Sequence, residues 1–80
     1  MKTLDLHGMR HEDARKTTAS FIDRAVVESS RGKNYNIEII TGHSKKMQDI
    51  VVEVLEEYKV VYFIGGYLGM NPAVITAEIG

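Results

Sequence analysis

The sequence predicts a two-layer α/β fold in which two helices cover one face of a mixed four-stranded sheet. Two observations support it. The spacing of apolar residues alternates between the two-residue period of strands and the 3.6-residue period of helices, and the elements follow in the order βαβαββ. Strand–helix–strand units with parallel strands are right-handed in nearly all proteins. Because there are only two helices and the first two strands carry alternating polar residues, a sheet covered on one face is favoured.

The first strand and helix are separated by a glycine. Thr3–His7 should form the strand, because its two leucines alternate with polar residues, and Gly8 should end it. From about His11 to Ser30 apolar residues recur every three or four positions, which is typical of one face of a helix. Glu12 and Asp13 in its first turn suit the helix dipole.

The second strand and helix repeat this pattern. Tyr35–Thr41 should be a strand that Gly42 interrupts, and Ser44 is the expected N-cap of the helix that follows. Apolar residues from Met47 to Tyr58 give this helix the clearest amphipathic pattern in the chain.

The last third of the chain should contain two strands joined by a glycine-rich turn. Val60–Ile64 is short and continuously apolar, which predicts a third strand. Gly65–Pro72 is the expected turn, and Ala73–Ile79 is the expected fourth strand, antiparallel to its neighbours.

Composition limits the possible functions. The 80 residues leave room for one domain over 1–80, and 44% hydrophobic with 26% charged residues is typical of a folded protein. The absence of cysteine excludes disulfides, thiolate zinc sites and cysteine nucleophiles. A net charge of −1 excludes a strongly basic coat but not a local basic patch. No apolar run approaches the roughly 18 residues of a membrane span, so we expect no membrane partner and a cytoplasmic protein.

The three histidines fall beside the ends of the first two strands. Loops at the carboxyl ends of parallel strands commonly form sites, and His7, His11 and His43 should lie at one such edge. Asp5 is two residues before His7, so on a strand it would share a face with the imidazole and could orient it as a general base or acid. The alternative is that polar residues gathered in two loops by chance.

The start of the second helix is a candidate anion site. A helix N-terminus carries partial positive charge, Lys45 and Lys46 lie in its first turn, and Gly42 lets the backbone approach a ligand. Arg10 and His43 should be close by. The alternative is two solvated lysines with no ligand.

Metal ligation and base stacking add two further hypotheses. Asp5, His7, His11 and His43 could hold a divalent metal, although no ligand spacing here is diagnostic. Among the aromatic residues, Tyr58 and Phe63 are expected in the core, and Tyr67 in the glycine-rich turn is the one expected to be exposed for stacking.

Two motifs and the final turn resemble the small MutS-related (Smr) domain family. Leu4–Gly8 reads LDLHG, the family's first motif, and Ile39–Ser44 is similar to its second motif. Gly65–Val74 also fits, so the resemblance covers essentially the whole chain in order. It implies a fold like the carboxyl-terminal domain of a bacterial translation initiation factor, with sheet order 1-2-4-3 and strand four antiparallel.

The resemblance also implies a function. Family members bind nucleic acid, and several are nicking endonucleases on DNA or endonucleases on RNA. Carried over to this chain, Asp5 and His7 would be functional residues of the first motif, with Thr41, Gly42 and His43 in the second. The family's second motif usually reads Thr-Gly-x-Gly before the His-Ser pair. Here Thr41-Gly42 runs straight into His43-Ser44, so the second glycine and its neighbours are missing, and the shorter loop could lose a backbone N–H that approaches phosphate.

Three functions follow as hypotheses. The first is an endonuclease in which His7 acts as general base or acid, Asp5 orients it and His43 protonates the leaving oxygen. Residues expected to bind nucleic acid are Gly8, Arg10, His11, Thr41, Gly42, Ser44, Lys45, Lys46 and Tyr67. The second is a nucleic-acid-binding module without cleavage. The third is an interaction module that forms a weak homodimer through the apolar edge of Val60–Ile64.

Overall fold

A computed structural model describes residues 2–30, 32, 35–65 and 73–79 of the chain. Its elements follow the predicted order βαβαββ. They are β1 (Lys2–Asp5), α1 (His11–Ser29), β2 (Tyr35–Ile40), α2 (Lys45–Glu57), β3 (Val61–Ile64) and β4 (Val74–Ile79).

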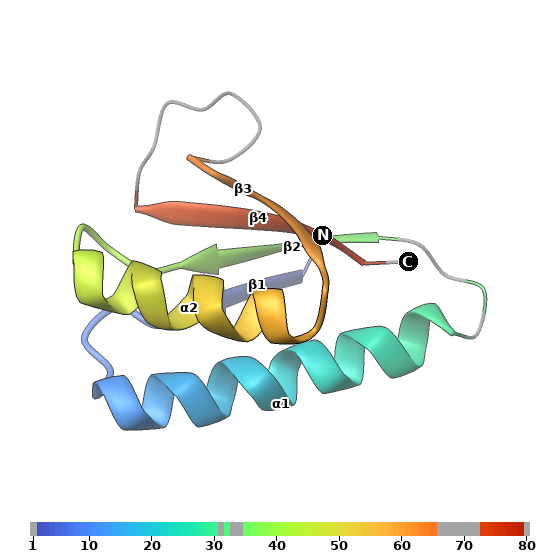
Figure 1. The fold of residues 1–80 in the computed structure, drawn as a ribbon, viewed down its shortest axis with the longest axis horizontal. Helices are drawn as coiled ribbons and strands as arrows, with labels where there is room; N and C mark the ends of the chain where they lie inside the picture. Colours follow the sequence, from blue (N-terminus) through green and yellow to red (C-terminus); the bar gives the residue numbers. More distant parts are fainter. Residues whose placement is uncertain (1, 31, 33–34, 66–72, 80) are drawn as a thin grey trace.

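The strands form one sheet in the order β1-β2-β4-β3. β1 and β2 are parallel, whereas β4 runs antiparallel to β2 and β3. Both helices lie on the same face of this sheet (Figure 1). The predicted two-layer fold is therefore confirmed, including the strand order that the family resemblance implied.

The core lies between the sheet and the two helices. Leu4 of β1 is in register with Ile39 of β2, which is in register with Ile75 of β4. Ile39 and Ile75 are fully buried, and α1 packs against α2 above them. Apolar burial at this layer, worth about 1.5–3 kcal/mol for each large side chain, holds the β1 and β2 ends together beneath the helices.

Helix α2 begins and ends with defined capping contacts. The Ser44 side chain accepts a hydrogen bond from the Met47 N–H at 3.1 Å, which confirms the predicted N-cap. At the other end the Val60 N–H donates to the Leu55 carbonyl at 3.1 Å, and Lys59 adopts a φ of 57°. This is a Schellman ending, a motif that usually places glycine where this chain has lysine.

The structure differs from the sequence-based expectation at several element ends. β1 ends at Asp5 rather than at His7, because the chain turns there: the Met9 N–H donates to the Leu6 carbonyl, and Gly8 adopts a φ of 80°. Phe63, expected in the core, is 47% exposed because it lies on edge strand β3. Tyr67 and the rest of 66–72 lie outside the described residues.

Candidate functional site

The turns that follow β1 and β2 meet at one end of the molecule (Figure 1). The Leu6 N–H donates to the Ile40 carbonyl at 2.9 Å, so the two chains stay paired as they leave the sheet. At Gly42 a Cβ atom would lie only 3.3 Å from Cδ2 of the His7 ring. The prediction that these two turns share an edge of the sheet is confirmed.

Gly42 sits directly against the imidazole of His7. Its φ is +73°, in the left-handed region that side-chain-bearing residues rarely adopt. The absent side chain leaves the space that the His7 ring borders. Both features favour glycine at this position, where the backbone of the second turn approaches His7 closely.

Thr41 anchors the second turn to the end of β4. Thr41 is 2% exposed. Its N–H donates to the Ala73 carbonyl at 2.8 Å, and its hydroxyl lies 3.1 Å from the same oxygen. The hydroxyl is also 3.0 Å from the Gly42 carbonyl. Thr41 therefore holds the backbone that carries Gly42 in place.

Asp5 shapes the first turn through the backbone. Its Oδ1 accepts a hydrogen bond from the main-chain N–H of His7 at 2.9 Å. This is an Asx turn, in which a carboxylate binds the N–H two residues on. Because the strand has already ended, the carboxylate holds the backbone of His7, in place of the predicted contact with the imidazole.

The two turns and the start of both helices border an open hollow of about 390 Å³, here called the histidine hollow. All three histidines line it, and all three are exposed. Its lining residues are His7, Gly8, Met9, His11, Thr41, Gly42, His43, Ser44 and Met47. Seven of these were predicted as site residues; the predicted residues Asp5, Arg10, Lys45 and Lys46 do not line it.

Met9 and Met47 are the lining residues that the sequence analysis missed. Met47 is 3% exposed and belongs to the core cluster, and Met9 packs against that cluster. The helical period placed Met47 on the buried face of its helix, so nothing in the pattern marked it as the wall of a site. The two thioethers give the histidine hollow an apolar side next to its imidazoles.

A smaller hollow of about 210 Å³ continues from the histidine hollow along the start of α2. Lys45 lines it, but its Nζ lies 2.6 Å from Oδ1 of Asp49, one helical turn away. Lys46 is exposed in the same turn, and no acidic residue lies there. The start of α2 is therefore basic, with one of its two lysines engaged in an exposed ion pair.

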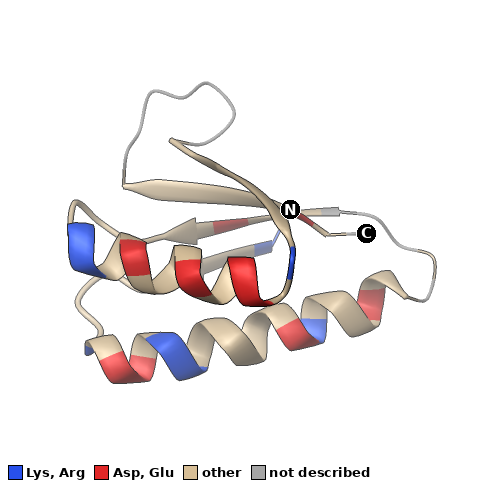
Figure 2. Cartoon of the chain, viewed as in Figure 1, with Lys and Arg blue, Asp and Glu red and all other residues tan. Residues whose placement is uncertain are grey.

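Charge is separated along α2. Figure 2 shows basic residues at the start of the helix and acidic residues along the rest of it. The acidic residues of this helix are Asp49, Glu53, Glu56 and Glu57. The basic end of α2 is the one beside the histidine hollow, which is where an anion would be attracted.

In the described part of the chain no group of three histidine or carboxylate side chains is placed to hold a metal ion. No described helix is long and apolar enough to cross a membrane.

Comparison with known protein families finds a match. The family model of the Smr domain matches residues 4–66, which run from within β1 to just beyond β3 and include both turns of the site. No curated protein and no solved structure matches the chain.

Proposed function

The chain belongs to the Smr domain family, and from this premise we propose that it binds nucleic acid and cleaves phosphodiester bonds in the histidine hollow. The observation that carries the proposal is the close approach of Gly42 to the ring of His7, which brings two imidazole-bearing turns together. Imidazole is the side chain best suited to exchange protons near neutral pH. Two of them beside one bond can serve as base and acid.

In the proposed reaction, one imidazole accepts the proton of the attacking hydroxyl or water. The new P–O bond forms as the bond to the leaving oxygen breaks, and the second imidazole donates a proton to that oxygen. We assign His7 and His43 to these two roles, since they come from the two turns and line the same hollow. His11 also lines the hollow and is assigned to binding.

The phosphate itself would rest on the start of α2. The first N–H groups of a helix lack partners within the helix, and Ser44 already takes that of Met47. The others can donate to phosphate oxygens, with Lys46 adding positive charge. Asp5 and Thr41 are positioning residues in this scheme, because each holds the backbone of one turn.

A cleavage assay on supercoiled DNA and on structured RNA tests the proposal. His7→Gln and His43→Gln should each lose about 10²–10⁴-fold in rate, because glutamine cannot exchange the proton. His11→Gln is the matched control in the same hollow and should change affinity more than rate. Equal cleavage by the parent and His7→Gln would trace the activity to a contaminant and end the proposal.

Asp5 gives a second, sharper comparison. Asp5→Asn keeps an oxygen that can accept the His7 N–H, whereas Asp5→Ala removes it. If Asp5 acts on the backbone, Asp5→Asn should retain most activity and Asp5→Ala should lose it. Equal loss in both variants would instead indicate that the negative charge of the carboxylate is needed.

Binding without cleavage is the second candidate function. The second motif lacks the family's second glycine and the residues beside it, and Lys45 is held by Asp49, so fewer groups reach the phosphate. A pure binder would hold oligonucleotides with a steep salt dependence and cut none. In that case Lys46→Ala should weaken binding to all sequences alike.

A further inference from the structure

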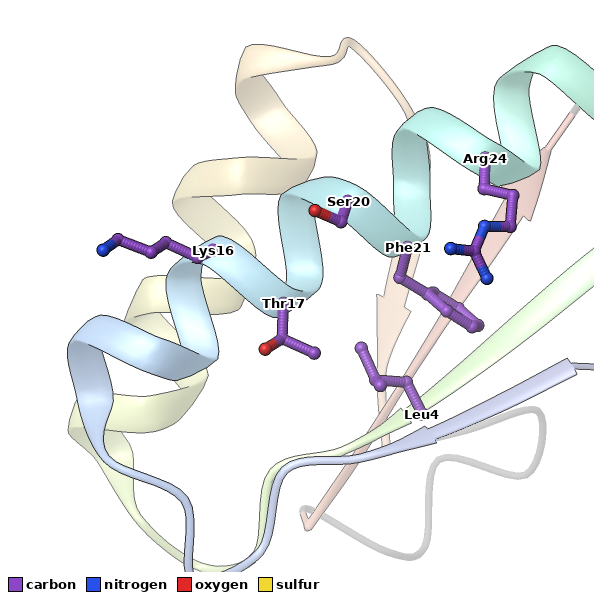
Figure 3. Close-up of a pocket in the computed structure, with 6 residues that line it drawn as sticks. All are labelled: Leu4, Lys16, Thr17, Ser20, Phe21 and Arg24. Atoms are coloured by element: carbon purple, nitrogen blue, oxygen red, sulfur yellow. The ribbon is translucent and has the colours of Figure 1, made fainter.

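A second concave surface lies between β1 and α1, away from the two turns (Figure 3). It has a volume of about 390 Å³, and a smaller hollow of about 260 Å³ adjoins it along β1. We call the larger one the β1–α1 groove. It is lined by Leu4, Lys16, Thr17, Ser20, Phe21 and Arg24.

The charged residues that line the groove are all basic. Lys16 and Arg24 are exposed, and within the described part of the chain neither side chain has an ion-pair partner. They are eight residues apart on α1, which places them about 12 Å apart along the helix axis. The groove therefore carries unneutralised positive charge at both ends, although the whole chain has a net charge of −1.

An aromatic ring lies between these two cations. Figure 3 shows Phe21 pointing from α1 toward Leu4, with Arg24 on one side and Thr17 on the other. Phe21 is half-buried: it packs against the core and still lines both hollows. Thr17 and Ser20 add hydroxyl groups that can donate to phosphate oxygens.

Cations, hydroxyl groups and a partly exposed aromatic ring are the groups with which proteins bind single-stranded nucleic acid. A basic groove follows the backbone, and an aromatic ring stacks on a base. A base in a duplex is already stacked and paired, so it cannot reach Phe21. We propose that the β1–α1 groove binds an unpaired stretch of the nucleic acid whose backbone is cut in the histidine hollow. This inference rests on the proposed function.

The groove is close enough to the histidine hollow for one strand to occupy both. Leu4 precedes His7 by three residues, which can span at most about 10 Å. Lys16 follows His11 by five residues on α1, about 7.5 Å along the helix. Leu4 and Lys16 line the groove, and His7 and His11 line the hollow. The preferred substrate would then be a single strand, or a duplex with an unpaired segment beside the cleavage position.

Binding measurements test this inference. The ligands are a fluorescent oligothymidylate and a duplex of equal length, and binding of each is measured over a range of salt concentrations. The variants are Lys16→Gln, Arg24→Gln and the double variant; Lys59→Gln is the control, a lysine at the far end of α2. The double variant should weaken single-strand binding several-fold and reduce the salt slope by about 1.4, the value for two lost phosphate contacts. Duplex binding and Lys59→Gln should be unchanged.

NMR gives a measurement that does not depend on substituting the half-buried Phe21. Titrating the parent protein with oligothymidylate should shift the amides of Thr17 and Ser20 together with the ring of Phe21. Unshifted resonances at these three residues while the strand binds would overturn the inference.

The other outcomes separate the two proposals. If cleavage depends on His7 but the double variant binds like Lys59→Gln, the groove assignment is wrong and the proposed function stands. Equal weakening of single-strand and duplex binding would show a general electrostatic effect and also overturn it. Tighter binding of an Asp/Glu-rich peptide at the groove would assign it to a protein partner. If the parent binds no nucleic acid, both proposals fail.

Discussion

Gly42→Ala tests the contact between the two turns. An alanine there must adopt the left-handed backbone conformation, which costs about 1–2 kcal/mol. Its Cβ would also lie 3.3 Å from Cδ2 of His7, closer than an ordinary van der Waals contact. The ring must therefore shift by a few tenths of an ångström, or the turn must open. Both effects act on Gly42 and His7, which line the histidine hollow from the two turns.

Gly32→Ala is the matched control for this substitution. Gly32 has a φ of +89° and would place its Cβ in open space, beyond α1 and away from the site. Both variants should lose about 1–2 kcal/mol of unfolding free energy in urea, seen as a fall in Tm of roughly 4–8 °C per kcal/mol for a domain of this size. The backbone penalty is thus common to both, and the contact with His7 is specific to Gly42→Ala.

Activity and the His7 resonances separate the two variants. Gly42→Ala should displace the Cδ2–Hδ2 signal of His7 and reduce nucleic-acid cleavage or binding, whereas Gly32→Ala should leave both unchanged. If Gly42→Ala kept full activity and an unshifted His7 signal, the reasoning that the second turn positions His7 would be refuted.

Four further predictions concern stability and assembly. Thr18→Val should raise the unfolding free energy by about 1–3 kcal/mol in urea, because the buried Thr18 hydroxyl has no hydrogen-bond partner. Lys59→Gly should raise the unfolding free energy by roughly 0.5–1 kcal/mol, since glycine adopts the positive φ of this position without strain. Lys59→Ala should give no such increase, because alanine keeps the strain. The hydrogen bond to Asp23 raises the pKa of Tyr58 above its ordinary value of 10.0. The resulting stability is present below pH 10 and lost as pH rises through the raised pKa, so Tyr58→Phe should abolish that loss. If the exposed β3 edge forms the predicted homodimer, Phe63→Lys should convert a concentration-dependent mass to a constant monomer mass in light scattering; a parent that is monomeric at high concentration contradicts the dimer.

Most of the fold could be predicted because local and tertiary signals agree. The apolar period of α2 and its Ser44 cap fixed that helix to within a residue, since the same residues that favour a helix are buried by it. At β1 the local and tertiary signals disagree. Leucine alternation continues through Leu6, but the Asp5 carboxylate captures the N–H of His7 and the chain turns two residues early. The Asp-x-His spacing could have predicted that turn.

Burial on the third strand could not be predicted from its residues. An apolar run such as Val61–Ile64 is typical of a central strand, and only the strand order places it at the edge. That exposes Phe63, which the pattern assigned to the core. The strand order itself came from the family resemblance, because handedness and element order left more than one arrangement open.

The site was predictable in position but not in detail. The rule that sites lie at the carboxyl ends of parallel strands placed His7 and His43 together correctly. The ion pair between Lys45 and Asp49 could also have been predicted, since the two residues are four apart on a helix. Where Arg10 points depends on how α1 packs on the sheet, which spacing along the chain does not determine.

The central claim is that the two turns form one phosphodiester site, and a single NMR titration tests it most directly. A nuclease-resistant oligonucleotide should shift the amides of His7 and Gly8 in the first turn, and of Gly42 and His43 in the second, along one common binding curve. Shifts confined to one turn, or different affinities for the two, would contradict the claim.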